Sequence, residues 1–358
     1  MSLKGNKGEL SELYAFFSLL ADGKLFSADE NLSKTKSFVE IKSIERQDEK
    51  EILTYEIEEG TILIKKSDFA ILSFTQNEAK SLAEKILEDI TKSSKLQSET
   101  KEEIISRHVT KASQKSTKKG DVEIKIYDPN HGITSDQEFS IKSFLGSDPT
   151  LFNANKTTNI IFELTDESDN PISSLEIDRI NAITTGHKYI KRVKEIIDSG
   201  YNIKFHSFQD KTFRLNLEII DSDLPEIIAE VVLTKYRDKI TKIVDVIQFL
   251  RENNPMNYDL SEGHKFYEYR IINFLTEAAL GMTSKSVWSG EFQVVGGIII
   301  IKPDAEILCY HLIDFNKFKK YLKNSTRLDN PSGSKMGYGS LYQEDERSYL
   351  KLNFQIKA

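Results

Sequence analysis

Two neighbouring segments carry acidic and basic side chains at alternate positions. One is "GDVEIKIYD", which begins at Gly120, and the other is "EFSIKS", residues 138–143. Successive side chains of a strand point to opposite faces, so each segment predicts one apolar face and one polar face. The polar faces would hold Asp121, Glu123, Lys125, Glu138, Ser140 and Lys142. Carboxylates and lysines on adjoining strands are the groups that metal-dependent phosphodiester hydrolysis requires.

In that chemistry, carboxylate oxygens hold Mg²⁺, which keeps several waters and binds through one or two carboxylates plus phosphate. The metal lowers the pKa of a bound water and offsets the charge that grows on the phosphorus oxygens. A nearby lysine orients the nucleophile and stabilises the same charge. Half-buried strands often have polar outer faces, so alternation alone does not identify such a site.

A helix predicted at residues 7–21 contributes another carboxylate. Its apolar face has the helical spacing i, i+3, i+4, i+7 in Leu10, Leu13, Tyr14 and Phe17. Glu12 stands at the edge of that face in "KGELSE", and Gly23 is a suitable stop signal. The spacing Lys-Gly-x-x-x-Glu resembles the opening helix of many PD-(D/E)xK nucleases. In those enzymes the helix glutamate packs over the sheet and joins the metal site.

The remaining pattern predicts an α+β protein. Alternating segments at 50–73 predict strands, and helices are expected at 76–106, 177–199, 223–250, 264–280 and 315–323. A hairpin is predicted at 291–301 and 306–313, followed by a Gly/Ser loop at 330–340 and two closing strands. We expect residues 1–165 to form a mixed central sheet flanked by helices, and residues 166–358 to form an α/β accessory half.

Composition indicates a globular protein with a substantial core. Of the 358 residues, 39% are hydrophobic and 29% are charged. No run approaches the ~18 apolar residues of a membrane span, and "MSLKGNKGEL" has no apolar export signal. The single cysteine, Cys309, excludes an internal disulfide. A cytoplasmic protein without a membrane partner is therefore expected.

The net charge of −7 argues at first sight against a nucleic-acid partner. A binding surface depends, however, on where the charges lie rather than on their sum. Residues 107–119, "RHVTKASQKSTKK", carry basic side chains and no acid, whereas acids cluster in stretches such as "ERQDEKEILTYEIEEG". The distribution is compatible with a basic groove on an acidic body.

Several blocks resemble the HpaII-type family of type II restriction endonucleases. They are "NKGELSELYAFFSLLADGKLFSADENL", "KGDVEIKIYDPNHG", "FSIKSFLGSDPTLFNANKTTN", "VVGGIIIIKPDAEILCYHLIDFNKFKKYLKNST" and "YLKLNFQI". They extend over nearly the whole chain, and the third block is the most specific. The resemblance implies a PD-(D/E)xK core in residues 1–165, a DNA-recognition role for residues 166–358, and Mg²⁺-dependent cleavage of double-stranded DNA at a short palindrome. The best-known members of the family cleave at CCGG.

Carried over to this sequence, the resemblance gives Asp121 the first acid position of the nuclease fold and Lys142 the lysine position. Ser140 stands where the family pattern Glu-x-Lys has its acid. A hydroxyl is a poor Mg²⁺ ligand, so another carboxylate must supply the second contact. Glu12 is the first choice, with Glu138 or Glu123 on the strand faces behind it.

Two further stretches carry candidate DNA contacts. The first, "NANKTTN", offers Lys156, Thr157 and Asn159 for phosphate or base-edge hydrogen bonds. The second, "NSTRLDNPSGSKMGYG", offers Arg327, Ser334 and Lys335. Arginine and lysine are the usual readers of guanine in the major groove. Ordinary polar surface loops would have the same composition.

Two alternatives to a restriction enzyme remain. One is an enzyme of the same fold without sequence specificity, such as a repair or junction nuclease. The other is a DNA-binding protein whose nuclease site has decayed, which the serine at position 140 would allow. For the restriction enzyme, a palindromic target predicts a homodimer on DNA. A DNA methyltransferase is the expected functional partner, without direct contact.

Overall fold

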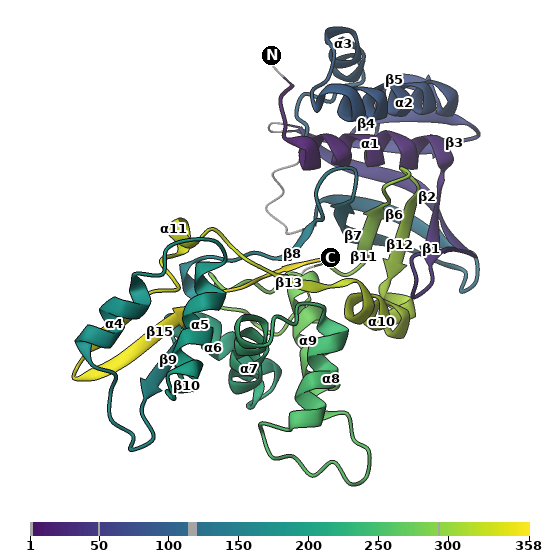
Figure 1. Ribbon diagram of the computed structural model, residues 1–358. Helices are drawn as coiled ribbons and strands as arrows, with labels where there is room; N and C mark the ends of the chain where they lie inside the picture. Colours follow the sequence, from purple (N-terminus) through teal and green to yellow (C-terminus); the bar gives the residue numbers. More distant parts are fainter. Residues whose placement is uncertain (1–2, 49–50, 114–119, 293) are drawn as a thin grey trace. The chain divides into compact units, whose positions relative to one another are not determined.

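The computed structural model describes residues 3–48, 51–113, 120–292 and 294–358 (Figure 1). The chain divides into two compact units, each described separately below. Unit 1 comprises Met1–Pro149 and Phe292–Tyr321, and unit 2 comprises Thr150–Glu291 and Leu322–Ala358. This division differs from the boundary predicted at 165. Residues 292–321 join unit 1 because they supply two strands of its sheet.

In the described part of unit 1, one mixed sheet has the strand order β1-β12-β11-β7-β6-β2-β3-β4-β5. Its strands are β1 (Lys24–Ala28), β2 (Lys34–Asp48), β3 (Glu51–Glu58), β4 (Thr61–Lys66), β5 (Phe69–Thr75), β6 (Val122–Asp128), β7 (Ile133–Ser143), β11 (Gly297–Ile301) and β12 (Ile307–His311). β1 also pairs with β2. The strands β1, β12, β11, β7, β6 and β2 therefore close into a ring. The strands predicted within 50–73, at 121–127 and at 138–143 are confirmed.

The predicted hairpin near 300 is also confirmed, and its two strands lie between β1 and β7 in the sheet. β11 pairs antiparallel with β12 and parallel with β7, opposite Ser140 and Lys142 (Figure 1). Every residue of β11 is buried. Gly297 has φ +119°, and a Cβ there would lie 2.0 Å from the carbonyl oxygen of Tyr310. Only glycine allows β12 to approach this closely.

Helices α1 (Lys7–Asp22) and α2 (Gln76–Ser93) lie side by side over the sheet of unit 1 (Figure 1). The helix predicted at 7–21 is confirmed. Asn6 caps α1 and Gly23 ends it in the left-handed conformation. The helix predicted at 76–106 is interrupted, because Ser94 adopts a left-handed conformation before α3 (Ser98–Ser106).

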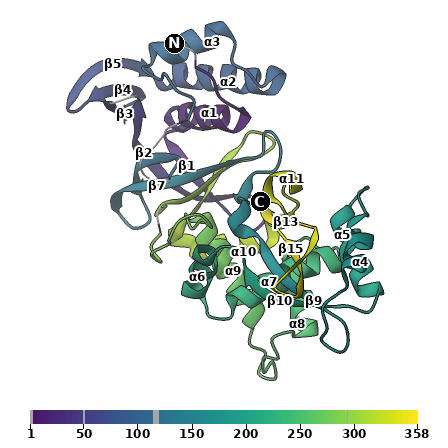
Figure 2. The ribbon, with the colours of Figure 1, turned by 90° about the vertical axis from the view of Figure 1, so that its left-hand side faces the viewer.

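Unit 2 combines helices with two small sheets, ordered β10-β9-β15-β14 and β13-β16-β8. The strands are β8 (Thr150–Phe152), β9 (Ile160–Thr165), β10 (Asn202–Phe208), β13 (Arg327–Asp329), β14 (Leu341–Glu344), β15 (Arg347–Leu352) and β16 (Gln355–Lys357). The helices are η1 (Lys156–Thr158), α4 (Ser174–Asn181), α5 (Lys188–Asp198), α6 (Lys211–Ile220), α7 (Leu224–Arg237), α8 (Ile243–Asn253), α9 (Phe266–Ala279) and α11 (Gly333–Met336). Figure 2 shows α4 and α5 beside each other.

Two of the long helices predicted for this unit are interrupted. The helix predicted at 177–199 is broken into α4 and α5, because Gly186 and His187 have positive φ. The helix predicted at 223–250 is likewise two helices, α7 and α8. The helix predicted at 264–280 is confirmed as α9. The helix predicted at 315–323 is confirmed as α10 (Phe315–Ser325), whose residues up to Tyr321 belong to unit 1.

The mixed α+β class predicted from the sequence is confirmed. In the described part of the chain, no helix combines the length and the apolar composition that crossing a membrane requires.

Candidate active site

The antiparallel pair β6–β7 brings the first acid and the serine together. Asp121 directly precedes β6, and its backbone N–H donates to the carbonyl of Phe139 at 2.9 Å. Its carboxylate oxygen Oδ2 accepts from Ser140 Oγ at 3.0 Å and from the backbone N–H of Ile141 at 2.7 Å. Two donors from β7 therefore fix the carboxylate of Asp121, and the serine at the position of the second acid is a hydrogen-bond partner of the first acid.

The alternation predicted for the two strands holds for the core face. Val122, Ile124, Ile126 and Phe139 are buried in the main core of unit 1. Ser140, on the opposite face, is also buried, with 6% of its surface exposed. Lys142 is half-buried. The polar face near the end of β7 is therefore partly enclosed, and charges there are less screened than on an open surface.

Glu12 of α1 shares this environment. The pKa of its carboxyl is raised to about 8, first by burial and second by the charge of Asp121. The charge of Lys142 acts in the opposite direction. Since α1 contacts β7, the fold brings together the two carboxylates and the lysine that the sequence singled out. Near neutral pH, partial burial and, second, the negative charge of Asp121 keep Glu12 largely protonated.

The two acids on the strands, Glu123 and Glu138, face each other across the β6–β7 pair. The side chain of Glu138 lies over Gly120, where an added Cβ would be 3.0 Å from its Cβ. Across the described residues, no three His, Cys, Asp or Glu side chains are grouped so that they could hold a metal ion. The acids that the structure couples are Glu12 and Asp121.

The candidate DNA contacts in "NANKTTN" have different surroundings. Lys156 is exposed at the start of η1. Thr157 is half-buried, and its backbone N–H donates to Asn155 Oδ1 at 2.7 Å. Asn159 is 1% exposed, and its amide nitrogen donates to Gln209 Oε1 at 2.8 Å. In this conformation the Asn159 amide is used inside unit 2, and a contact between Asn159 and DNA stays a prediction.

The candidates near the C-terminus lie on ordered elements. Arg327 opens β13, which pairs with β16, and is half-buried. Lys335 is exposed on the short helix α11. Ser334 lies on the same helix, but its side chain is outside the described part of the structure, as are residues 114–119 of the basic run. The loop predicted at 330–340 contains a helical turn.

Comparison with known proteins identifies the family to which this chain belongs. The family described as HpaII restriction endonuclease matches residues 6–358. The chain is 37% identical to the type II restriction enzyme HpaII of Haemophilus parainfluenzae over 371 residues, which cover 99% of this chain and 98% of that enzyme. This chain belongs to the HpaII restriction endonuclease family. It is thus a restriction endonuclease, and the predicted resemblance is confirmed. No solved structure matches it.

For this member of the HpaII family, the structure adds a residue that the sequence reasoning missed. Arg46 of β2 is 4% exposed, and its guanidinium lies 5.2 Å from the ring centre of Phe16 on α1. It donates to the backbone carbonyls of Lys111 and Ala112. Its charge lowers the pKa of Glu12. The sequence did contain a signal for Arg46: it follows the apolar Ile44 by two positions, which places both side chains on the same face of a strand.

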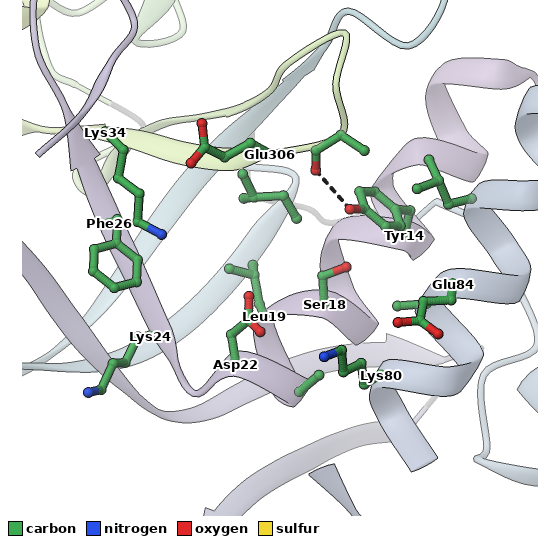
Figure 3. Close-up of a pocket in the computed structure, with 15 residues that line it drawn as sticks. Tyr14, Ser18, Leu19, Asp22, Lys24, Phe26, Lys34, Lys80, Glu84 and Glu306 are labelled. Atoms are coloured by element: carbon green, nitrogen blue, oxygen red, sulfur yellow. Dashed lines mark hydrogen bonds between the residues drawn. The ribbon is translucent and has the colours of Figure 1, made fainter. Parts of the chain in front are cut away.

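The pocket drawn in Figure 3 lies elsewhere in unit 1. Its volume is about 220 Å³, and its labelled residues include Tyr14, Ser18 and Asp22 of α1. Asp22 is ten positions after Glu12, which corresponds to ~15 Å along the helix axis. Lysines and carboxylates both line the pocket, so it has no dominant charge. Glu12, Asp121 and Lys142 are not among the residues that line it.

Proposed function

We propose that this restriction endonuclease depends on Mg²⁺ and hydrolyses double-stranded DNA at a short palindrome, with CCGG suggested by the family resemblance. The observation that carries the proposal is the grouping of Glu12 and Asp121 beside Lys142. Asp121 is hydrogen-bonded to β7, which carries Lys142 and contacts α1, and the charge of Asp121 helps to raise the pKa of Glu12. Family membership supports the reaction class, and the relative from Haemophilus parainfluenzae is named as a type II enzyme. A protein of the same family that binds DNA without cleaving it would not need this coupled pair.

We assign α1, β6 and β7 to the core of a PD-(D/E)xK nuclease. An acid on the first helix, an acid at the start of one strand and a lysine near the end of the next support the assignment. Ser140 occupies the position of the middle acid. Its hydrogen bond to Asp121 gives it a role in holding that carboxylate.

The donor set fits Mg²⁺. This ion binds through one or two carboxylates, with waters and phosphate oxygens as its other ligands. Glu12 and Asp121 would hold it, with Glu138 as the remaining candidate ligand. A cation beside the pair would also offset the repulsion that raises the pKa of Glu12. When bound, Mg²⁺ would supply an acidified water and neutralise charge on the phosphate.

The side chains of the site then have separate tasks. Asp121 is held by two donors from β7, so its orientation is set before substrate arrives. To hold the cation, Glu12 would have to release its proton to solvent. Lys142 orients the attacking water and stabilises the charge that develops on the phosphate. Each task depends on charge or hydrogen bonding rather than on packing.

DNA reading is assigned to unit 2. Arg327 and Lys335 are proposed as readers of guanine, and Lys156 and Thr157 as phosphate contacts. A palindromic site has two-fold symmetry, so the enzyme is expected to act as a homodimer on DNA. A methyltransferase that modifies the same site would protect the host DNA without contacting this chain.

Digestion of unmethylated plasmid with Mg²⁺ tests the proposal. We expect discrete fragments whose ends map to one palindrome, and no cleavage by Lys142→Ala. Lys125→Ala is the matched control, because Lys125 is an exposed lysine on the neighbouring strand β6. A smear would indicate a nuclease without specificity. Full-length plasmid after prolonged incubation with the folded protein would indicate a decayed site.

A further inference from the structure

Two glycines of the segment Pro331–Ser340, here called the clamped segment, lie against one aromatic ring. A Cβ at Gly333 would lie 1.6 Å from the hydroxyl oxygen of Tyr189. A Cβ at Gly339 would lie 2.0 Å from Cδ1 of the same ring. At Gly337, between them, a Cβ would meet nothing within 4 Å. Glycine at 333 and 339 therefore permits close packing on Tyr189 rather than free movement.

Arg192, on the same helix as Tyr189, holds the backbone at the end of the clamped segment. Its side chain is buried, with 5% of its surface exposed. The guanidinium donates to the carbonyl of Gly339 and, at 3.3 Å, to Oγ of Ser340. It also donates to the backbone carbonyl of Asn181 at 2.6 Å. A planar group with several donors can join two stretches of chain in this way.

Other contacts hold the middle of the clamped segment. The ring centres of Tyr338 and Tyr189 are 4.6 Å apart, and the Tyr338 hydroxyl donates to the carbonyl of Pro331 at 3.0 Å. The amide nitrogen of the buried Asn159 donates to the carbonyl of Met336 at 2.9 Å. The clamped segment is thus fixed at both ends and at its centre, while Lys335 remains exposed.

The surface next to the clamp suits a DNA backbone. The first turn of α5 carries Lys188 and no acidic residue, and the exposed Lys191 follows one turn later. Lys188 Nζ lies 5.2 Å from the centre of the Tyr189 ring, so its charge is next to the ring on which the clamped segment packs. Lys191 Nζ donates to the carbonyl of Thr185 at 3.4 Å, in the turn before α5. Phosphate contacts of this kind orient a protein on the duplex, whereas base-edge contacts supply specificity.

We propose that Tyr189 and Arg192 are positioning residues for sequence discrimination, holding the clamped segment in the one shape from which Lys335 reads a base edge. This inference rests on the proposed function, which assigns DNA reading to unit 2. Ordering a mobile group on binding costs conformational entropy. A backbone that is already ordered avoids part of that cost, but only when it binds the duplex that fits its shape. A side chain on such a rigid backbone is also placed more precisely.

The test compares cleavage of the cognate duplex with that of a duplex changed at one base pair. Gly339→Ala would force the ring of Tyr189 aside, and Tyr189→Ala would remove it. We expect both variants to lower the ratio of kcat/KM values, cognate over changed, by tenfold or more. Tyr189→Phe, which keeps the ring, should retain the ratio within threefold.

Matched controls separate this effect from general damage. Gly337→Ala introduces a comparable backbone strain, since φ is +66° at Gly337 and +86° at Gly339, but it meets no side chain. Arg192→Met removes the donors to Gly339 and Ser340 and should lower the ratio as Tyr189→Ala does. Its matched control, Arg179→Met, removes ion pairs to Glu176 and Glu195 instead. The two controls, Gly337→Ala and Arg179→Met, should keep the ratio within threefold.

An unchanged ratio in Gly339→Ala and Tyr189→Ala would overturn the inference. So would an equal loss of cleavage on both duplexes by variants that keep the circular dichroism spectrum of the wild type. Failure of the proposed function would look different, because the wild-type enzyme itself would then show no preferred duplex.

Discussion

The candidate active site of unit 1 and the clamped segment of unit 2 are organised by different forces. In unit 1, neighbouring strands and one helix bring together charges whose cost of burial is offset by Lys142, by Arg46 and, in our proposal, by a cation. In unit 2, a segment is held by aromatic packing and by a buried arginine, and Lys335 stays exposed. Variants of unit 1 should therefore affect cutting, and variants of unit 2 should affect the choice of sequence.

The largest effect is expected from Lys142→Ala. Loss of one group that stabilises the transition state costs ~10²–10³ in rate. The single-turnover cleavage rate at saturating Mg²⁺ should fall by that factor, while the preference for the cognate duplex in binding remains. Lys125→Ala should cleave at the wild-type rate. A Lys142→Ala rate within tenfold of wild type would show that unit 1 cuts with another group.

Arg327→Ala and Lys335→Ala should affect the preference for the cognate duplex rather than the cleavage step. A lost bidentate base contact costs roughly 1–3 kcal/mol for the correct base, whereas a lost phosphate contact weakens all sequences alike. At least one of the two should lose cognate binding tenfold or more while binding to a scrambled duplex is retained. Lys156→Ala should weaken both duplexes and make the salt dependence shallower. Equal weakening of both duplexes by Arg327→Ala and Lys335→Ala would make the C-terminal stretch a backbone contact.

Ser140→Ala should have the smallest effect. It removes one hydrogen bond to Asp121, worth about 1 kcal/mol, while the backbone N–H of Ile141 still holds the carboxylate. The cleavage rate should fall several-fold, with no change in sequence preference. A loss as large as that of Lys142→Ala would give Ser140 a direct part in the reaction.

The two regions also differ in how much of their structure the sequence predicted. Alternation along two strands grouped Asp121, Ser140 and Lys142 correctly, because strand geometry has a fixed period of two. The contact of Glu12 with this face came from a resemblance to an opening helix. The role of Arg46 was missed, since a charged residue on a core face has no local signal for its partners.

In unit 2, local patterns were less informative. Gly333 and Gly339 lie in the predicted Gly/Ser loop, yet they accommodate the ring of Tyr189, well over a hundred positions earlier in the chain. Asn159 was a candidate DNA contact because it lies in the polar stretch "NANKTTN". In the structure its amide holds the segment around Met336. Two predicted helices were broken at residues such as His187, whose left-handed conformation the apolar pattern does not reveal. Such features depend on tertiary contacts.

The central claim is that Glu12 and Asp121 share a cation, and the pKa of Glu12 gives a direct test. A carboxyl with a pKa of about 8 is mostly protonated at pH 7, so it must release its proton to become a ligand. Its raised pKa also means that the metal-free protein loses stability as pH rises from the unfolded value of about 4.5 towards 8. Glu12→Gln should remove that loss.

The decisive measurement is calorimetric titration of Mg²⁺ into Lys142→Ala protein bound to cognate duplex, at pH 7 in two buffers with different ionisation enthalpies. Lys142→Ala prevents cleavage during the titration. We expect Mg²⁺ to bind with release of close to one proton. In the Glu12→Gln, Lys142→Ala double variant this proton release should disappear, and the affinity for Mg²⁺ should fall at least tenfold. Unchanged affinity and unchanged proton release after Glu12→Gln would contradict the account.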